Sequence, residues 1–336
     1  MTEIDIGAVV ASLDNEDMLG FLRLFPQDFV AQMEKEAEHP GDRPSRVTCL
    51  GMGGSAAAGD FIASLSDYQG ECQVLTHRGY SLPNWLSDGL VISTSYSGNT
   101  EETLDATSEA NLRALEVIGI SSGGELGESN NHILVPSGQP PRSAFGHLFG
   151  ALLRTAISRG VIPSEDMDGL SDRLKETVEE FDFVTNSESP TLDIARTLLG
   201  KEIGIISAPE LDCAGVRFVN QLNENGGVFA RSKALPEMNH NEIIAWTDEA
   251  AKESQALIFL TWDGMHPRVS KRVEWMMDNV EVDIAWQLHC DGESLLESML
   301  YSCIVMDWVS CAIAILRGKD PSAIGAIRSL KGFLSE

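Results

Sequence analysis

The sequence predicts an α/β protein made of two tandem units, each with a parallel sheet covered by helices on both faces. Short, continuous apolar runs alternate with helical stretches, a pattern typical of buried parallel strands. The alternation pauses after residue 136 and restarts at residue 202. The chain has 336 residues, of which 43% are hydrophobic, so it is long enough for two domains of ordinary size.

The expected elements follow in order along the chain. Residues 1–45 carry apolar residues at helical spacing and predict an N-terminal helical segment, which ends in HPGDRPS. A first unit at 46–185 and a second at 190–336 should meet near TNSESPT. Helices are expected from about Phe145 to Phe183 and around 293–317. The expected strands are RVTCLGM, CQVLT, LVISTSYS, LEVIGISS and HILVP in the first unit, and EIGIISAP, QALIFLTW and VEVDIAWQ in the second.

The charge balance excludes two classes of partner. The chain has 51 acidic and 24 basic residues, which gives a formal net charge of −27 at pH 7. Such a field repels nucleic acid and anionic membranes. The acids are scattered rather than gathered in a tail. Two explanations remain open: a cytoplasm with very high salt, where screening removes the self-repulsion, or an ordinary acidic cytosolic protein.

Other features of the composition favour a cytoplasmic protein. The six cysteines form no Cys-x-x-Cys pair and most lie in apolar runs, as reduced core thiols do. The N-terminus is acidic and lacks the basic start of a signal peptide. The most apolar stretch, MLYSCIVMDWVSCAIAIL, is interrupted by Asp307 and predicts a core helix rather than a membrane span.

The stretch STSYSGNTEET combines hydroxyl residues with a glycine where a strand should give way to a helix. Ser95, Ser97, Gly98 and Thr100 fall in this turn. A helix N-terminus offers unpaired backbone N–H groups and a partial positive charge, so it can hold an anion without lysine. The simpler alternative is ordinary N-capping by one hydroxyl. Several hydroxyls at this spacing favour a phosphate site.

A second turn, GMGGSAAAGD, also lies between an expected strand and an expected helix. It contains Gly54 and Ser55. It lacks the last glycine of the dinucleotide fingerprint and the Gly-Lys-Ser/Thr of a P-loop. Because the carboxyl ends of parallel strands share one sheet edge, two such turns together predict one small phosphorylated ligand.

Gly-Gly-Ser at 53–55 followed by Ser-x-Ser-Gly-x-Thr at 95–100 resembles the sugar isomerase (SIS) domain. The resemblance extends from about residue 45 to the end and is specific to the archaeal and bacterial bifunctional phosphoglucose/phosphomannose isomerases. It implies two SIS subdomains, each a doubly wound α/β/α sandwich, in a homodimer without cofactor or metal. The histidines accordingly show no spacing typical of a metal site. The other segments that carry the resemblance are SGQPPRSAFGHLFGALL, NQLNENGG and LPEMNHNEIIAW.

The resemblance also assigns roles to single residues. Glu224 would be the base that moves the proton, and Arg142 would stabilise the enediolate. His240, contributed by the neighbouring subunit, would open the sugar ring with help from Lys331. Without the resemblance, Glu224 reads as a helix-end carboxylate on a solvated face, His240 as a packed histidine and Lys331 as a solvated lysine. The implied phosphate ligands are Gly54, Ser55, Ser95, Ser97 and Thr100.

Two positions depart from the family pattern. Gly226 stands where relatives often have a lysine, and Ser322 ends an Asp-Pro-Ser segment where relatives often read Asp-Pro-Thr. The implied reaction interconverts glucose 6-phosphate, and mannose 6-phosphate, with fructose 6-phosphate. The alternatives are a non-catalytic phosphosugar-binding regulator and another SIS sugar-phosphate isomerase, such as one acting on aminosugars. The acidic first 45 residues lack the basic face of a DNA-binding helix, which disfavours the regulator.

Overall fold

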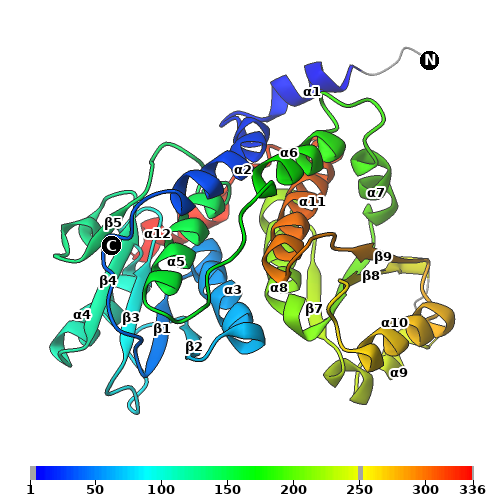
Figure 1. Ribbon diagram of the computed structural model, residues 1–336. Coiled ribbons are helices and arrows are strands. Elements are labelled where there is room, and N and C mark those ends of the chain that lie inside the picture. Colours follow the sequence, from blue (N-terminus) through cyan, green and yellow to red (C-terminus); the bar gives the residue numbers. More distant parts are fainter. Residues whose placement is uncertain (1–4, 249–252, 335–336) are drawn as a thin grey trace. The chain divides into compact units, whose positions relative to one another are not determined.

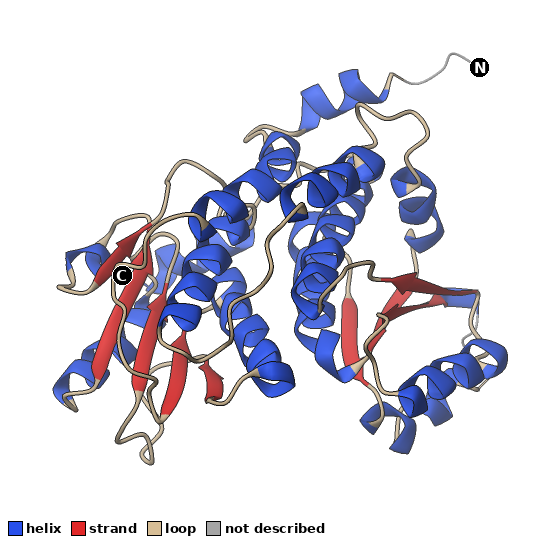
Figure 2. Ribbon diagram, viewed as in Figure 1, coloured by secondary structure: helices blue, strands red, loops and turns tan. Residues whose placement is uncertain are grey.

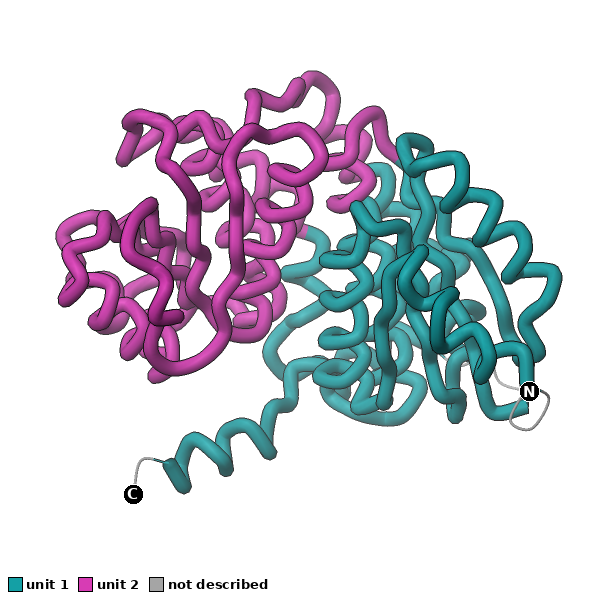
Figure 3. The backbone as a smooth tube through the Cα atoms, turned by 90° about the horizontal axis from the view of Figure 1, so that it is seen from below, with its two compact units in different colours: residues 1–23, 176–291, 301–336 teal, residues 24–175, 292–300 magenta. Residues whose placement is uncertain are grey.

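The structure, a computed structural model, describes residues 5–248 and 253–334 (Figure 1). The chain forms two compact units, each drawn from separated segments (Figure 3). The N-sheet unit comprises residues 24–175 and 292–300, and the C-sheet unit comprises residues 1–23, 176–291 and 301–336. Helices α2 (Met18–Met33), α6 (Leu170–Phe181) and α11 (Leu295–Leu316) have residues in both units.

The N-sheet unit contains a five-stranded parallel sheet in the order β2-β1-β3-β4-β5. Every residue of the central strand β3 is buried, as expected when helices cover both faces. Helices α3 (Gly53–Gln69) and α5 (Phe145–Ser158) pack through Phe61 and Phe145, whose ring centroids lie 5.2 Å apart. Helix α4 (Glu101–Leu112) buries Ala106 and Ala110 in a second apolar cluster. The strands are β1 (Arg46–Leu50), β2 (Gln73–His77), β3 (Leu90–Thr94), β4 (Glu116–Ser121) and β5 (His132–Leu134).

The C-sheet unit contains a four-stranded parallel sheet in the order β7-β6-β8-β9. Figure 2 draws the strands of both sheets in red. Its strands are β6 (Glu202–Ser207), β7 (Ala230–Ala234), β8 (Gln255–Thr261) and β9 (Ile284–His289). The predicted fold class, two parallel sheets with alternating helices, is confirmed. The helices that lie wholly within this unit are α1 (Ile6–Leu13), α7 (Thr191–Leu198), α8 (Asp212–Gln221), α9 (Ile243–Trp246), α10 (Pro267–Asn279) and α12 (Gly325–Leu334).

Two local features were not predicted. The helical region expected from Phe145 to Phe183 is present, but it consists of two helices, because α5 ends at Ser158 and α6 begins at Leu170. Gly160 follows the end of α5 and Gly169 precedes α6. Both have a positive φ (64° and 68°), which interrupts the helical backbone. Strand β7 was not expected, since its sequence ARSKA has no β-branched residue and alternates exposed cations with smaller side chains.

Helix α11 is the one helix of the described chain that is long and apolar enough to cross a membrane, and 89% of its most apolar stretch is buried inside the protein. This burial is that of a core helix, as predicted. All six cysteines lie in the described part of the chain, are buried and form no disulfide. Burial raises the pKa of Cys49 to about 12, so its thiol is protonated at neutral pH.

Candidate functional site

The two predicted anion-binding turns meet where the winding of the first sheet reverses. In the order β2-β1-β3-β4-β5 the chain moves in opposite directions from β1 and β3, which opens a crevice at their carboxyl ends. The turn at 51–55 follows β1 and the turn at 95–100 follows β3, which pairs with β1. The Tyr96 backbone N–H donates to Ser55 Oγ at 3.3 Å, so the turns touch directly.

No side chain caps either of the helices that begin at these turns. Thr100 occupies the N-cap position of α4 without a side-chain capping bond, because its hydroxyl lies 2.9 Å from Ser95 Oγ instead. Met52 holds the same position before α3 and also provides no side-chain cap. The ordinary capping alternative therefore does not describe these turns. Their uncapped N-termini suit an anion.

The glycines of the two turns serve different purposes. Gly98 has a φ of 69°, and a Cβ there would lie 1.8 Å from the carbonyl oxygen of Gly123, so protein packing requires a glycine. At Gly54 a Cβ would meet no atom within 4 Å. Packing therefore does not explain Gly54, whereas a ligand close to the α3 N-terminus would.

The segment that carries Arg142 is tied to the hydroxyl turn. The Gln139 backbone N–H donates to the Tyr96 hydroxyl at 3.1 Å, and Gln139 Nε2 donates to Asp28 Oδ2 at 2.7 Å. His147 Nε2 lies 3.4 Å from the same carboxylate oxygen. Burial raises the pKa of Asp28 and lowers the pKa of His147, so both charged forms are disfavoured. This buried cluster holds the segment of Arg142, which is itself 8% exposed.

Glu224 lies in a one-turn π-helix, Leu222–Gly226, that continues α8. Such turns are rare and occur frequently at functional sites. Helix α11 fixes the turn on both sides of Glu224, since Gln221 Nε2 donates to Asp307 at 2.6 Å and Asn225 Nδ2 donates to Ser310 Oγ at 2.9 Å. Glu224 is half-buried. The sequence pattern gave no sign of this geometry.

Gly226, which departs from the family pattern, is buried at the end of the π-turn. A Cβ at this position would lie 3.1 Å from Ile313 Cγ2 of α11. The close packing of the π-turn on α11 accounts for a small residue here.

His240 and Lys331 lie on two further elements of the C-sheet unit. His240 ends the short 3-10 helix Glu237–His240, which follows β7 at the carboxyl edge of the second sheet, and it is exposed. Lys331 lies in the last turn of α12, a helix without buried residues, and is also exposed.

The structure thus brings the five predicted phosphate ligands together and ties the Arg142 segment to them, all within the N-sheet unit. Glu224, His240 and Lys331 belong to the C-sheet unit. Sequence reasoning missed Tyr96, although it lies inside the hydroxyl motif, and it missed Asp28, for which no local signal exists. Within the described ranges, no group of three or more His, Cys, Asp or Glu side chains could hold a metal ion.

Comparison with known proteins relates this chain to sugar-phosphate isomerases. Residues 187–334 match the family model described as the bacterial phospho-glucose isomerase C-terminal SIS domain. A bifunctional phosphoglucose/phosphomannose isomerase from Thermoplasma volcanium is 31% identical over 289 residues, which cover 85% of this chain and 90% of the relative. Further enzymes with the same name match at similar identity.

Two other relationships are informative. A D-glucosamine-6-phosphate 4-epimerase from Sulfolobus acidocaldarius is 32% identical over 62% of this chain and 66% of its own length. The solved structure of a glucosamine-6-phosphate deaminase from Thermotoga maritima superimposes with a TM-score of 0.69 at 17% identity, covering 91% of this chain and 94% of that one. That likeness concerns the fold alone. The identity over most of the chain shows that this protein belongs to the family of bifunctional phosphoglucose/phosphomannose isomerases, enzymes of the sugar-phosphate isomerase type.

Proposed function

We propose that the chain interconverts glucose 6-phosphate, and mannose 6-phosphate, with fructose 6-phosphate through a cis-enediolate. The relatives that cover most of its length carry this activity in their names. The observation that carries the proposal is the pair of uncapped helix N-termini at the reversal point of the first sheet. In a chain of net charge −27, these backbone dipoles and the hydroxyls beside them bind a phosphate dianion without a lysine.

In this proposal the substrate phosphate rests on Ser55, Ser95, Ser97 and Thr100, with Gly54 leaving room for it at the start of α3. These residues are called the phosphate cradle below. Arg142 lies on the segment that is hydrogen-bonded to the cradle through Tyr96. A guanidinium held beside the reacting carbons stabilises the negative charge that develops on the enediolate oxygens.

The proton chemistry then falls to residues of the C-sheet unit. His240 and Lys331 move the proton between the sugar hydroxyl and the ring oxygen, which opens the ring. Glu224 removes the proton from C2 of the aldose and returns it to C1, which yields the ketose. Glucose and mannose 6-phosphates share one enediol, so a site that accepts both needs only room for rotation about the C2–C3 bond.

We further propose a cytoplasmic homodimer in which His240 serves the site of the neighbouring subunit. The exposure of His240 is compatible with such a contact. Co-purified heterodimers of His240→Ala and Glu224→Gln chains should regain part of the activity, because one of their two sites would then contain both intact residues. Verified heterodimers that stay inactive would assign both residues to one chain.

The proposed reaction is tested directly with purified protein and fructose 6-phosphate, with coupled reporters for glucose 6-phosphate and mannose 6-phosphate. Both products are expected. A parallel reaction with glucosamine 6-phosphate tests the activity named for the Sulfolobus acidocaldarius relative. Conversion of the aminosugar without conversion of fructose 6-phosphate would replace the proposed substrate class.

The phosphate cradle is tested by replacing both Ser95 and Ser97 with alanine. Each lost hydrogen bond to the dianion costs about 1.5–3 kcal/mol, so KM should rise roughly 10-fold or more for each hydroxyl. The matched control replaces Ser129 and Ser158, whose hydroxyls donate to nearby backbone carbonyls in the same unit. An unchanged KM in Ser95→Ala/Ser97→Ala would remove these hydroxyls from the phosphate site.

A further inference from the structure

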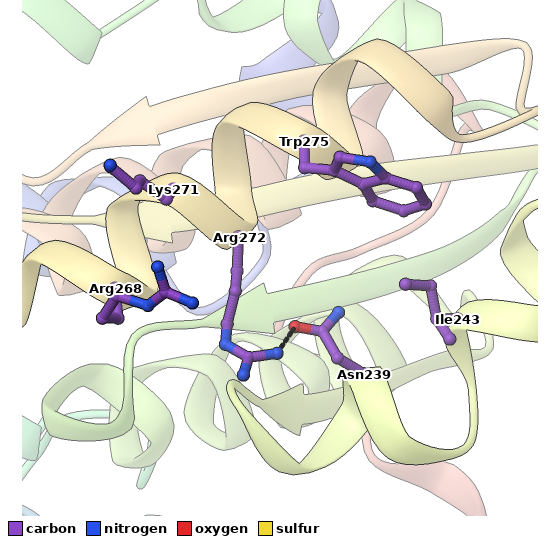
Figure 4. A pocket seen from close by; sticks show the side chains of 6 residues that line it. All are labelled: Asn239, Ile243, Arg268, Lys271, Arg272 and Trp275. Atoms are coloured by element: carbon purple, nitrogen blue, oxygen red, sulfur yellow. Dashed lines mark hydrogen bonds between the residues drawn. The ribbon is translucent and has the colours of Figure 1, made fainter.

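The C-sheet unit has a pocket of about 320 Å³ that none of the predicted site residues lines. This volume is at the lower end of the range of small-molecule sites, about 300–1,000 Å³. Helix α10 forms one wall, and Asn239 and Ile243 form the other (Figure 4). The residues that line it are Asn239, Ile243, Arg268, Lys271, Arg272 and Trp275.

Helix α10 turns one continuous stripe of side chains toward this pocket. Arg268, Lys271, Arg272 and Trp275 follow one another at i, i+3, i+4 and i+7, which places them on one helix face. A second stripe, made of apolar residues, is buried against the rest of the unit. The buried residues of that stripe are Val269, Val273 and Met276. The cations are therefore held on a fixed element rather than on a loop.

Most arginines of this chain have an acidic partner. Arg23 pairs with Asp182 at 2.6 Å, for example, and the exposed Arg196 pairs with Asp193. Throughout the residues that the structure describes, no ion pair links Arg268, Lys271 or Arg272 to a carboxylate. The chain has 51 acidic residues, yet these three cations lie together with no ion pair to a described carboxylate. Such a surface attracts an anionic ligand.

The two ends of the pocket differ in chemistry. Arg268 and Lys271 lie toward one end, and Trp275 and Ile243 toward the other (Figure 4). Between them, Arg272 donates a hydrogen bond to Asn239 Oδ1 at 3.1 Å. Trp275 is 49% exposed, so a flat ring can stack on its indole. Guanidinium and ammonium groups bind phosphate oxygens.

We propose that this pocket binds a nucleoside phosphate, with the phosphates on Arg268, Lys271 and Arg272 and the base against Trp275. Inorganic phosphate would leave the aromatic end unused, and a neutral ring compound would leave the cations unused. A ligand with phosphate at one end and a flat ring at the other uses both. The proposal rests on the C-sheet unit alone and is independent of the isomerase reaction.

The test is isothermal titration calorimetry of the full chain with ADP, with inorganic phosphate and adenosine as separate probes, at low salt. ADP should bind once per chain and more tightly than either probe. Arg268→Gln/Lys271→Gln should weaken ADP binding at least about 10-fold, because two charge-assisted contacts are lost. The control Lys175→Gln/Arg196→Gln removes the same two charges from exposed ion pairs and should bind as the unmodified protein does. Circular dichroism melting verifies that each variant is folded.

Two further variants separate this pocket from the cradle in the N-sheet unit. Trp275→Ala should weaken ADP binding but leave the affinity for inorganic phosphate unchanged. Ser95→Ala/Ser97→Ala should leave ADP binding unchanged, and loss of ADP binding there would place ADP in the other unit. The proposal is overturned if millimolar ADP gives no binding heat, if the glutamine pair binds like its control, or if ADP binds no better than inorganic phosphate.

Discussion

Glu224→Gln is expected to reduce the isomerase rate by about 10²–10⁴-fold, the usual contribution of a general base. The amide keeps the size of the side chain and most of its hydrogen bonding, but it cannot take a proton from carbon. The π-turn that carries Glu224 is held by α11 through Gln221 and Asn225, which the substitution leaves intact. The loss should therefore appear in kcat, with KM and thermal stability nearly unchanged.

The measurement is deuterium entry into fructose 6-phosphate in D₂O, followed together with the rate of isomerisation. The unmodified protein should incorporate label at the reacting carbon wherever exchange competes with internal transfer, and the Glu224→Gln protein should not. Glu202→Gln is the matched control, since it removes the same charge from an exposed position at the start of β6. Near-normal isomerisation and exchange in the Glu224 variant would exclude this residue as the base.

The sequence predicted where the two polar turns lie, at the ends of β1 and β3, because that signal is local. The strand, the short polar turn and the helix follow one another directly in the chain. The hydroxyls of residues 95–100 therefore lie at a helix N-terminus whatever the arrangement of the other strands. The absence of side-chain caps could not be predicted, because it depends on Thr100 bonding to Ser95 rather than to its own helix.

Features that depend on distant segments were beyond sequence reasoning. Asp28 supports the Arg142 segment although 111 residues separate it from Gln139. The π-turn at Glu224 is held by α11, whose Ser310 lies 85 residues beyond Asn225 in the chain. Strand β7 is polar and lies at the edge of its sheet, and its pairing with β6 rather than its composition makes it a strand.

The same helix that shapes the Glu224 turn also carries the most deeply buried charge pair of the described C-sheet unit. Arg217 of α8 and Asp307 of α11 form two parallel hydrogen bonds, at 2.7 and 2.8 Å, and each side chain is 4% exposed. Burial alone would lower the pKa of Arg217, but the Asp307 carboxylate raises it on balance, so the arginine stays charged. Asp307 also accepts the Gln221 bond, which joins this pair to the turn of Glu224.

Asp307→Ala should therefore lower the free energy of unfolding by about 3–5 kcal/mol, because it leaves the Arg217 guanidinium buried without its counter-charge. Urea unfolding followed by circular dichroism measures this loss. The exposed pair of Arg196 and Asp193 provides the control, and Asp193→Ala should change stability by less than about 1 kcal/mol.

The double variant Arg217→Met/Asp307→Leu should recover most of the loss, since it removes both buried charges together and fills their space. If Asp307→Ala is no less stable than Asp193→Ala, the ion pair does not hold α8 to α11. If the double variant is stable but has a low kcat, the pair is instead needed to position the Glu224 turn.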